Sequence, residues 1–136
     1  MHRFKSLALL RVMTPLDNKT RTQIVNRVLA ERSQRDLKLA QMKERQQQGL
    51  EVARIAAQIL KQEFGVQRVV IFGSMLDHER MWWGSDIDLA VWGLPQSDLF
   101  KAGAAIERGH NFSIDLVEIQ NARPHILNAV EQGVEL

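Results

Sequence analysis

The chain has 136 residues, of which 45% are hydrophobic, and a formal net charge of +2. This length and composition predict one domain with a modest core, with room for an appendage. The absence of cysteine excludes a disulfide framework and a thiolate metal site. No apolar run approaches the ~20 residues of a membrane helix, so we expect a cytoplasmic protein without membrane contact.

The charge is divided unevenly along the chain. Residues 1 to 76 carry 14 Lys and Arg against 6 Asp and Glu, whereas residues 77 to 136 carry 4 against 10. The N-terminal apolar stretch from Leu7 to Leu10 ends at Arg11, which makes it too short for a secretory signal. We expect an irregular segment as far as Pro15, followed by helix from about Asn18.

Residues 1–48 are predicted to form an N-terminal helical extension, with Gly49 at the boundary to a domain of residues 49–136. The apolar stripe of the extension is interrupted by a polar segment, and Ser33 with Asp36 could form a capping box there. This pattern favours a bend near residue 32, with the extension forming either one helix or two. Its basic surplus is modest and lacks interleaved aromatic residues, so we expect docking to a partner protein and no direct nucleic-acid binding.

The next elements are a helix, a strand and a turn. Apolar residues repeat at helical spacing from Leu50 to Phe64, and Gly65 provides a stop. The β-branched run Val66 to Phe72 predicts a buried strand. Gly73 and Ser74 end this strand where a helix could begin, so their backbone N–H groups could face a phosphate.

Three carboxylates follow on strand-like segments. Asp86 and Asp88 alternate with apolar residues, which places both carboxylates on one face, about 6.6 Å apart along the strand. Asp115 lies inside the run from Phe112 to Glu118, and we expect it to be buried, where a carboxylate needs a partner or a metal ion. Carboxylates on neighbouring strands could hold two Mg²⁺ ions together with substrate phosphate. Two further helices are predicted, over Gln96 to Arg108 and from Pro124 to Gly133.

The order of these motifs resembles that of the polymerase β nucleotidyltransferase superfamily, especially its minimal nucleotidyltransferases. The matching residues are Gly73-Ser74, then Ser85-Asp86-Ile87-Asp88-Leu89, then Asp115, and the resemblance covers about Leu50 to Leu136. It implies a small α/β fold with a mixed sheet flanked by helices, preceded here by the helical extension.

The resemblance also implies roles for individual residues. Gly73 and Ser74 would contact the triphosphate, and Asp86 and Asp88 would hold both Mg²⁺ ions. Asp115 would join the metal site and help to bind and deprotonate the acceptor hydroxyl. Ser85 is a further candidate for nucleotide binding, although it could simply end the loop before the strand.

The function implied by the resemblance is Mg²⁺-dependent transfer of AMP from ATP. Many small members are antitoxins that modify a tyrosine of a partner HEPN-type ribonuclease toxin, and we expect the same role here. One alternative is a binding-only antitoxin whose site has lost activity. Another is a transferase that acts on a hydroxyl of a small molecule or of RNA.

Trp82 and Trp83 are adjacent in the loop before Asp86. They could stack on a nucleobase. Adjacent tryptophans beside a strand more often cover a sheet edge or contact a partner, and we favour that interpretation.

Overall fold

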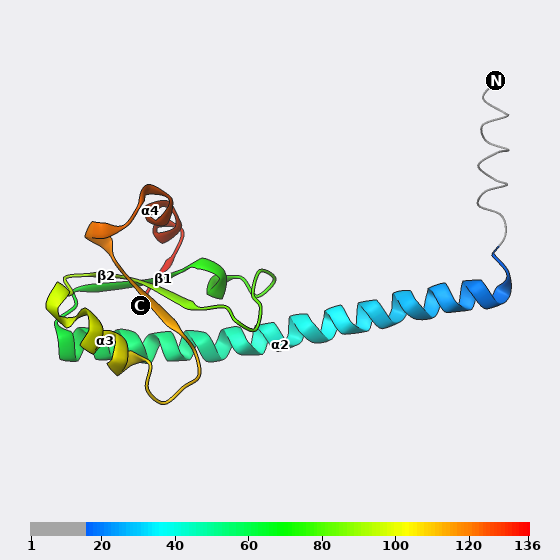
Figure 1. The fold of residues 1–136 in the computed structure, drawn as a ribbon, viewed down its shortest axis with the longest axis horizontal. Coiled ribbons are helices and arrows are strands. Elements are labelled where there is room, and N and C mark those ends of the chain that lie inside the picture. The colour runs from blue at the N-terminus through cyan, green and yellow to red at the C-terminus, as the bar shows by residue number, and fades with distance from the viewer. Residues whose placement is uncertain (1–15) are drawn as a thin grey trace, which may run out of the picture. The chain divides into compact units, whose positions relative to one another are not determined.

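The structure is a computed structural model that describes residues 16–136 (Figure 1). The expectations for the apolar stretch Leu7 to Leu10 and for an irregular segment up to Pro15 lie outside the described residues. The chain divides into two compact units, one ending at Lys38 and the other comprising Leu39–Leu136. None of the described helices combines the length and the hydrophobicity that a membrane span requires.

Helix α2 runs without interruption over Asn18–Phe64. The extension is therefore part of one helix and not of two, and Ser33 and Asp36 lie inside this helix instead of at a cap. Good helix formers flank these two residues on both sides, which offsets the weak preference of a polar segment for a turn. The N-terminus of α2 is capped by Asp17, whose Oδ1 accepts a hydrogen bond from the backbone N–H of Thr20 at 2.6 Å.

The C-terminal end of α2 agrees with the sequence pattern. The helix ends at Phe64, and Gly65 adopts a φ of +69°, a left-handed conformation that glycine adopts at little cost. The predicted helix stop is confirmed.

The compact unit begins at Leu39 and so includes residues 39–48, which the sequence pattern assigned to the extension. Met42 is only 1% exposed and belongs to the main hydrophobic core. Gly49 is also buried, and a Cβ atom built on it would lie 2.5 Å from Sδ of Met75 and 3.3 Å from Cε1 of Phe112. Gly49 therefore lets α2 pack closely against Met75 and Phe112, and it does not act as a linker between two domains.

The sheet has four strands in the order β3-β2-β1-β4. Strand β1 is Arg68–Phe72, β2 is Ile87–Trp92, β3 is Ile114–Glu118 and β4 is Val134–Glu135. β1 is antiparallel to both β2 and β4, whereas β2 and β3 are parallel. The predicted α/β class with a mixed sheet is confirmed, and β4 was not anticipated because a two-residue strand leaves no periodic pattern.

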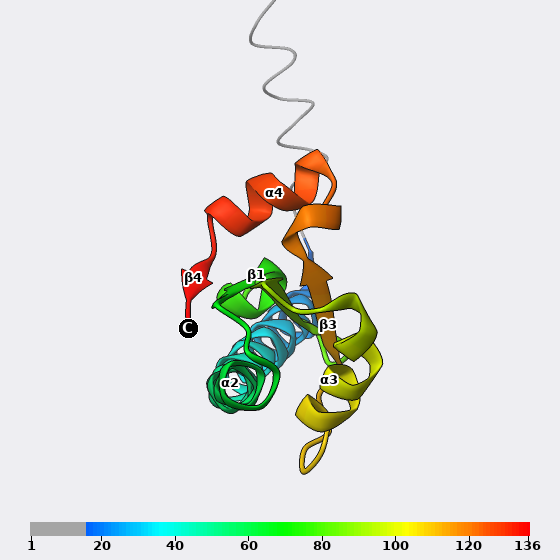
Figure 2. The same cartoon turned by 90° about the vertical axis from the view of Figure 1, so that its left-hand side faces the viewer.

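Helices cover both faces of this sheet (Figure 2). The part of α2 from residue 39 onward and helix α3 (Leu99–Ile106) lie on one face, and α4 (Pro124–Glu131) lies on the other. The larger core cluster forms between α2, α3 and the sheet, and a smaller cluster of Val70, Phe72, Ala90 and Val130 lies under α4. Helix α4 begins at the predicted Pro124, while the predicted Gln96–Arg108 helix begins with a 3-10 turn at Gln96–Asp98 and continues as α3.

Candidate active site

Two of the predicted carboxylates are direct neighbours across the sheet. Asp88 of β2 pairs in register with Asp115 of the parallel strand β3. On its other side, Asp88 pairs with Phe72, the last residue of β1. The parallel pairing thus brings Asp115 beside Asp88 at the point where β1 enters the Gly73-Ser74 turn.

The alternation of the strands places these carboxylates on the face that α4 partly covers. Ile87 and Leu89 are fully buried in the core on the α2 side, so Asp88 shares the opposite face with Ala90. Asp115 likewise shares a face with Val117, which packs against the cluster under α4. Asp86 precedes the first residue of β2 and is exposed.

The carboxylates differ in exposure. Asp88 is half-buried, whereas Asp86 and Asp115 are exposed. The expected burial of Asp115 is therefore wrong: β3 lies at the edge of the four-stranded sheet, where α4 does not cover its second residue. An exposed carboxylate remains accessible to a substrate or a cation.

Burial raises the pKa of the Asp88 carboxyl to about 6, and the nearby negative charges of Asp115 and Asp86 add to this shift. Loss of hydration and repulsion between like charges both disfavour the ionised form of Asp88. A bound cation would remove both penalties, so this arrangement of oxygen donors fits a hard divalent ion.

The three carboxylates do not form a complete metal site by themselves. Among residues 16–136, no three acidic or histidine side chains are gathered closely enough to hold a metal ion unaided. Mg²⁺ commonly keeps several waters and takes only one or two protein carboxylates together with substrate phosphates. Asp86, Asp88 and Asp115 therefore fit a site that is completed by the triphosphate of a bound nucleotide.

Position 73 requires a glycine because the Asp88 carboxylate lies against its backbone. Its φ of +84° lies in the left-handed region, and a Cβ atom at this position would overlap Oδ2 of the Asp88 carboxylate. The expected helix after this glycine is a single 3-10 turn, Gly73–Leu76, in which Ser74 accepts a backbone hydrogen bond from Asp77. The turn thus places exposed backbone directly beside a candidate metal ligand.

Ser85 closes the loop that precedes Asp86. It is 4% exposed, and its Oγ accepts a hydrogen bond from the backbone N–H of Trp82 at 3.0 Å. The backbone N–H of Ser85 donates in turn to the carbonyl of Trp82, also at 3.0 Å. These contacts give Ser85 a structural role in the loop, and its contact with a nucleotide stays a prediction.

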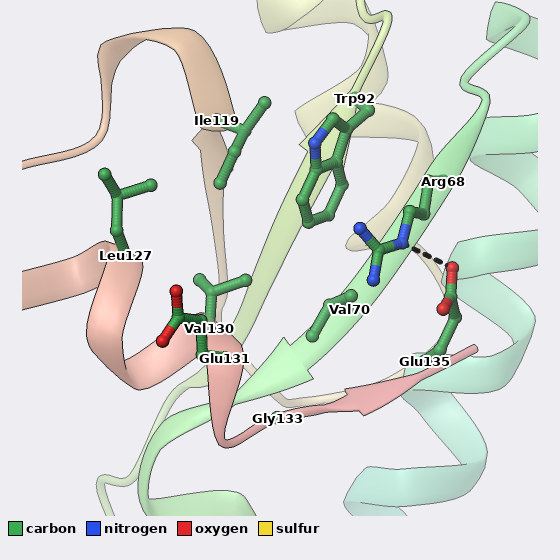
Figure 3. A pocket seen from close by; sticks show the side chains of 9 residues that line it. All are labelled: Arg68, Val70, Trp92, Ile119, Leu127, Val130, Glu131, Gly133 and Glu135. Carbon is green, nitrogen blue, oxygen red and sulfur yellow. Dashed lines mark hydrogen bonds and ion pairs between the residues drawn. The ribbon is translucent and has the colours of Figure 1, made fainter.

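A hollow of about 360 Å³ lies at the far end of the same sheet face, between β1, β2 and α4 (Figure 3). There the Arg68 guanidinium stacks 4.4 Å from the centre of the Trp92 ring, and its Nε donates to Glu135 at 2.6 Å. Trp92 is four residues beyond Asp88, which corresponds to about 13 Å along a strand. None of the three carboxylates lines this hollow. It is therefore separate from the carboxylate site.

Comparison with known proteins agrees with this geometry. The profile of the family described as Polymerase beta, Nucleotidyltransferase matches residues 55–136, which is more than half of the chain. The matched region includes the Gly73-Ser74 turn and all three carboxylates, and the mixed α/β fold is consistent with that family. Members generally use nucleoside triphosphates and divalent metal ions. A search of curated proteins found no match.

Proposed function

This chain belongs to the Polymerase beta, Nucleotidyltransferase family, and from that premise we propose that it transfers AMP from ATP to a hydroxyl of a partner protein. The partner would be a HEPN-type toxin, the acceptor a tyrosine, and the protein its antitoxin. The observation that carries the proposal is the register pair Asp88 and Asp115 beside the Gly73 turn. Nucleotidyl transfer requires such an arrangement, in which acidic groups converge next to a close backbone approach.

The reaction displaces pyrophosphate from ATP. The tyrosine oxygen forms a bond to the α-phosphorus, the bond from that phosphorus to the bridging oxygen of the β-phosphate breaks, and pyrophosphate leaves. Asp115 is exposed at the edge of the site, where it can accept the proton of the attacking hydroxyl. Asp86 and Asp88, with Asp115, would hold Mg²⁺ ions, which neutralise the negative charge that develops during phosphoryl transfer. Gly73 and Ser74 would position the triphosphate.

The size of the domain supports an acceptor on another protein. From Val66 onward the chain is used for the four strands and the two short helices α3 and α4. The described residues contain no second domain that could enclose a small acceptor above the carboxylates. An acceptor presented by a folded partner needs no such enclosure.

The N-terminal part of α2 supports partner docking. Ile24, Val25, Val28 and Leu29 are each at least 40% exposed, and Leu37 is 60% exposed. Basic residues Lys19, Arg21, Arg27, Arg32, Arg35 and Lys38 surround them. A helix that exposes apolar side chains over several turns gains stability when a partner covers them.

Transfer can be tested directly with the full-length protein. It is incubated with Mg²⁺, ATP labelled at the α-phosphate and the purified product of the neighbouring gene as the candidate partner. We expect label on one tyrosine of the partner and a mass increase of one AMP per modified site. Label that stays in ATP, with the partner unmodified at all Mg²⁺ concentrations, would refute the proposal.

A binding-only antitoxin is the second candidate, and the exposed apolar side chains of the N-terminal part of α2 favour it, because docking on that surface would need no catalysis. The double variant Asp86→Asn with Asp88→Asn separates the two functions. If the protein acts as a transferase, this variant no longer neutralises the partner. A binding-only antitoxin neutralises as well as the wild-type protein does.

A further inference from the structure

A polar hollow of about 300 Å³ lies beside the loop that leads into the carboxylate site. Trp83 of that loop forms one wall. Helix α2 forms the other with four residues from successive turns: Gln41, Glu44, Arg45 and Gln48. All five residues belong to the compact unit Leu39–Leu136.

Arg45 is held in an unusual way. Its guanidinium carbon lies 4.2 Å from the centre of the Phe112 ring, in cation–π geometry. Its Nε is buried, and no residue in the described part of the chain accepts a hydrogen bond from it. The side chain is thus oriented by stacking on Phe112, and Arg45 also lines the hollow.

The two tryptophans of the loop have different surroundings. The ring of Trp82 lies over Gly84, where even a Cβ atom would overlap it. Trp83 instead lines the hollow and is 58% exposed. Trp82 therefore packs on its own loop while remaining 63% exposed, and the favoured role of the two tryptophans at a sheet edge or a partner stays a prediction. Trp83 leaves its indole available to a ligand in the hollow.

We propose that this hollow binds a nucleobase, which stacks on Trp83 and bonds at its edge to Arg45, Gln41 and Gln48. A nucleobase is planar, offers a π face to the indole and carries donors and acceptors that match carboxamide and guanidinium groups. An aliphatic side chain of a protein partner would leave these polar groups unpaired at a cost. Glu44 can accept from an exocyclic amino group, which adenine, cytosine and guanine carry on their base-pairing edges.

The loop of Trp83 links the hollow to the carboxylates. Trp83 lies three residues before Asp86, and the two hydrogen bonds between Trp82 and Ser85 close the turn that connects them. A base on Trp83 would contact this loop from the α2 side of the sheet, whereas Asp88 lies on the opposite face. If the base belongs to the nucleotide substrate, the inference rests on the proposed nucleotidyl transfer. The same chemistry would also fit a base of single-stranded nucleic acid.

The test compares ligands that carry a base with one that does not. Full-length wild-type protein and Trp83→Ala are titrated calorimetrically with ATP and with inorganic triphosphate, both in Mg²⁺. A fluorescently labelled single-stranded oligoadenylate is titrated by anisotropy. The matched control is Phe100→Ala, because Phe100 is an aromatic residue of α3 that is 90% exposed and does not line the hollow.

If the base belongs to the nucleotide substrate, Trp83→Ala weakens ATP binding by ~10-fold or more, the usual loss for one stacked base, while triphosphate binding is unchanged. A loss confined to the oligoadenylate identifies nucleic acid as the source. Trp83→Phe should restore most of the affinity in either case. Phe100→Ala should bind all three ligands as the wild type does.

The inference is overturned if Trp83→Ala binds ATP and oligoadenylate with wild-type affinity, or if ATP and triphosphate binding fall equally. Should Trp83→Ala fail to fold, Gln41→Ala with Gln48→Ala provides the second test, since both side chains are exposed on a helix that tolerates alanine. That variant should also lose affinity for the base-containing ligand alone, and unchanged affinity would equally overturn the inference. Because these measurements record binding, a failure of AMP transfer to the partner leaves their outcome unaffected.

Discussion

Asp88 and Asp115 form a register pair on parallel strands, and the Asp88 carboxylate also lies against the Cα atom of Gly73. Asp88 is half-buried, and the pKa of its carboxyl is raised to about 6, whereas Asp115 is exposed. Such an arrangement lowers the stability of the fold unless the charges serve a function such as binding a cation. The first four predictions below test the function of these charges and of the adjacent turn, and the fifth tests where the compact unit begins.

Replacing Asp86 or Asp88 by Asn should abolish metal-dependent transfer and leave the fold intact, because each change removes one anionic ligand while keeping the side-chain shape. The measurement is transfer of label from ATP, with circular dichroism to check folding. Asp98→Asn is the matched control, since Asp98 lies in the 3-10 turn before α3 and its side chain makes no cap hydrogen bond there. Wild-type rates in both single variants would contradict the assignment.

Asp88 should make the stability of the metal-free protein depend on pH. Its pKa is about 6 in the folded protein against 3.8 for an unperturbed Asp, so the folded state binds the proton more tightly. The folded state is therefore favoured by Asp88 below pH 3.8, and this contribution is lost as the pH rises through about 6. Asp88→Asn removes the penalty of ionisation.

We therefore expect Asp88→Asn in EDTA to be more stable than the wild type at pH 8 and nearly equal to it at pH 4. The gain at pH 8 should be about 1–2 kcal/mol, because partial exposure of the carboxylate screens the full effect of the shift. Urea unfolding at both pH values measures it. An equal difference at pH 4 and pH 8 would show that the ionisation of Asp88 is not responsible.

Asp115→Asn should impair chemistry more than nucleotide binding. Asp115 is exposed at the edge strand β3, on the side from which an acceptor can approach, whereas Asp88 lies beside the Gly73 turn. Calorimetric titration with ATP and Mg²⁺, alongside single-turnover transfer rates, separates the two effects. A loss of ATP affinity as large as the loss of rate would remove this distinction.

Gly73→Ala should displace the Asp88 carboxylate and weaken ATP binding in Mg²⁺. Gly109→Ala is a close control, because Gly109 has the same φ of +84° and a Cβ atom there would meet nothing within 4 Å. Both variants should lose about 1–2 kcal/mol of stability from backbone strain. Only Gly73→Ala should lose ATP affinity as well, and a normal affinity would mean that the turn is purely structural.

Met42→Ala should lower the free energy of unfolding by about 2–4 kcal/mol, because Met42 is 1% exposed and its truncation leaves a cavity in the core. Leu37→Ala, at a position that is 60% exposed, should change it by about 0.5 kcal/mol or less. Chemical denaturation measures both values. Equal effects would mean that the compact unit does not begin near Leu39.

The sequence alone determined the longer helices and strands and the order of the site residues. Period-2 alternation around Asp88 and in the run containing Asp115 predicted two strands, and the structure places both residues in strands. Gly65 and Pro124 marked a helix end and a helix start correctly, because backbone preferences act locally. Local chemistry of this kind is readable without knowledge of the fold.

Contacts between distant segments were decided only by the tertiary structure. The close approach of Gly49 to Met75, the exposure of Asp115 and the pairing of two-residue β4 with β1 depend on how the layers pack. The wall that Arg45 forms opposite Trp83 belongs to the same class, since 37 intervening residues carry no periodic signal of it. Periodicity reports which face of an element is apolar, but the partner of that face is selected by packing of the whole domain.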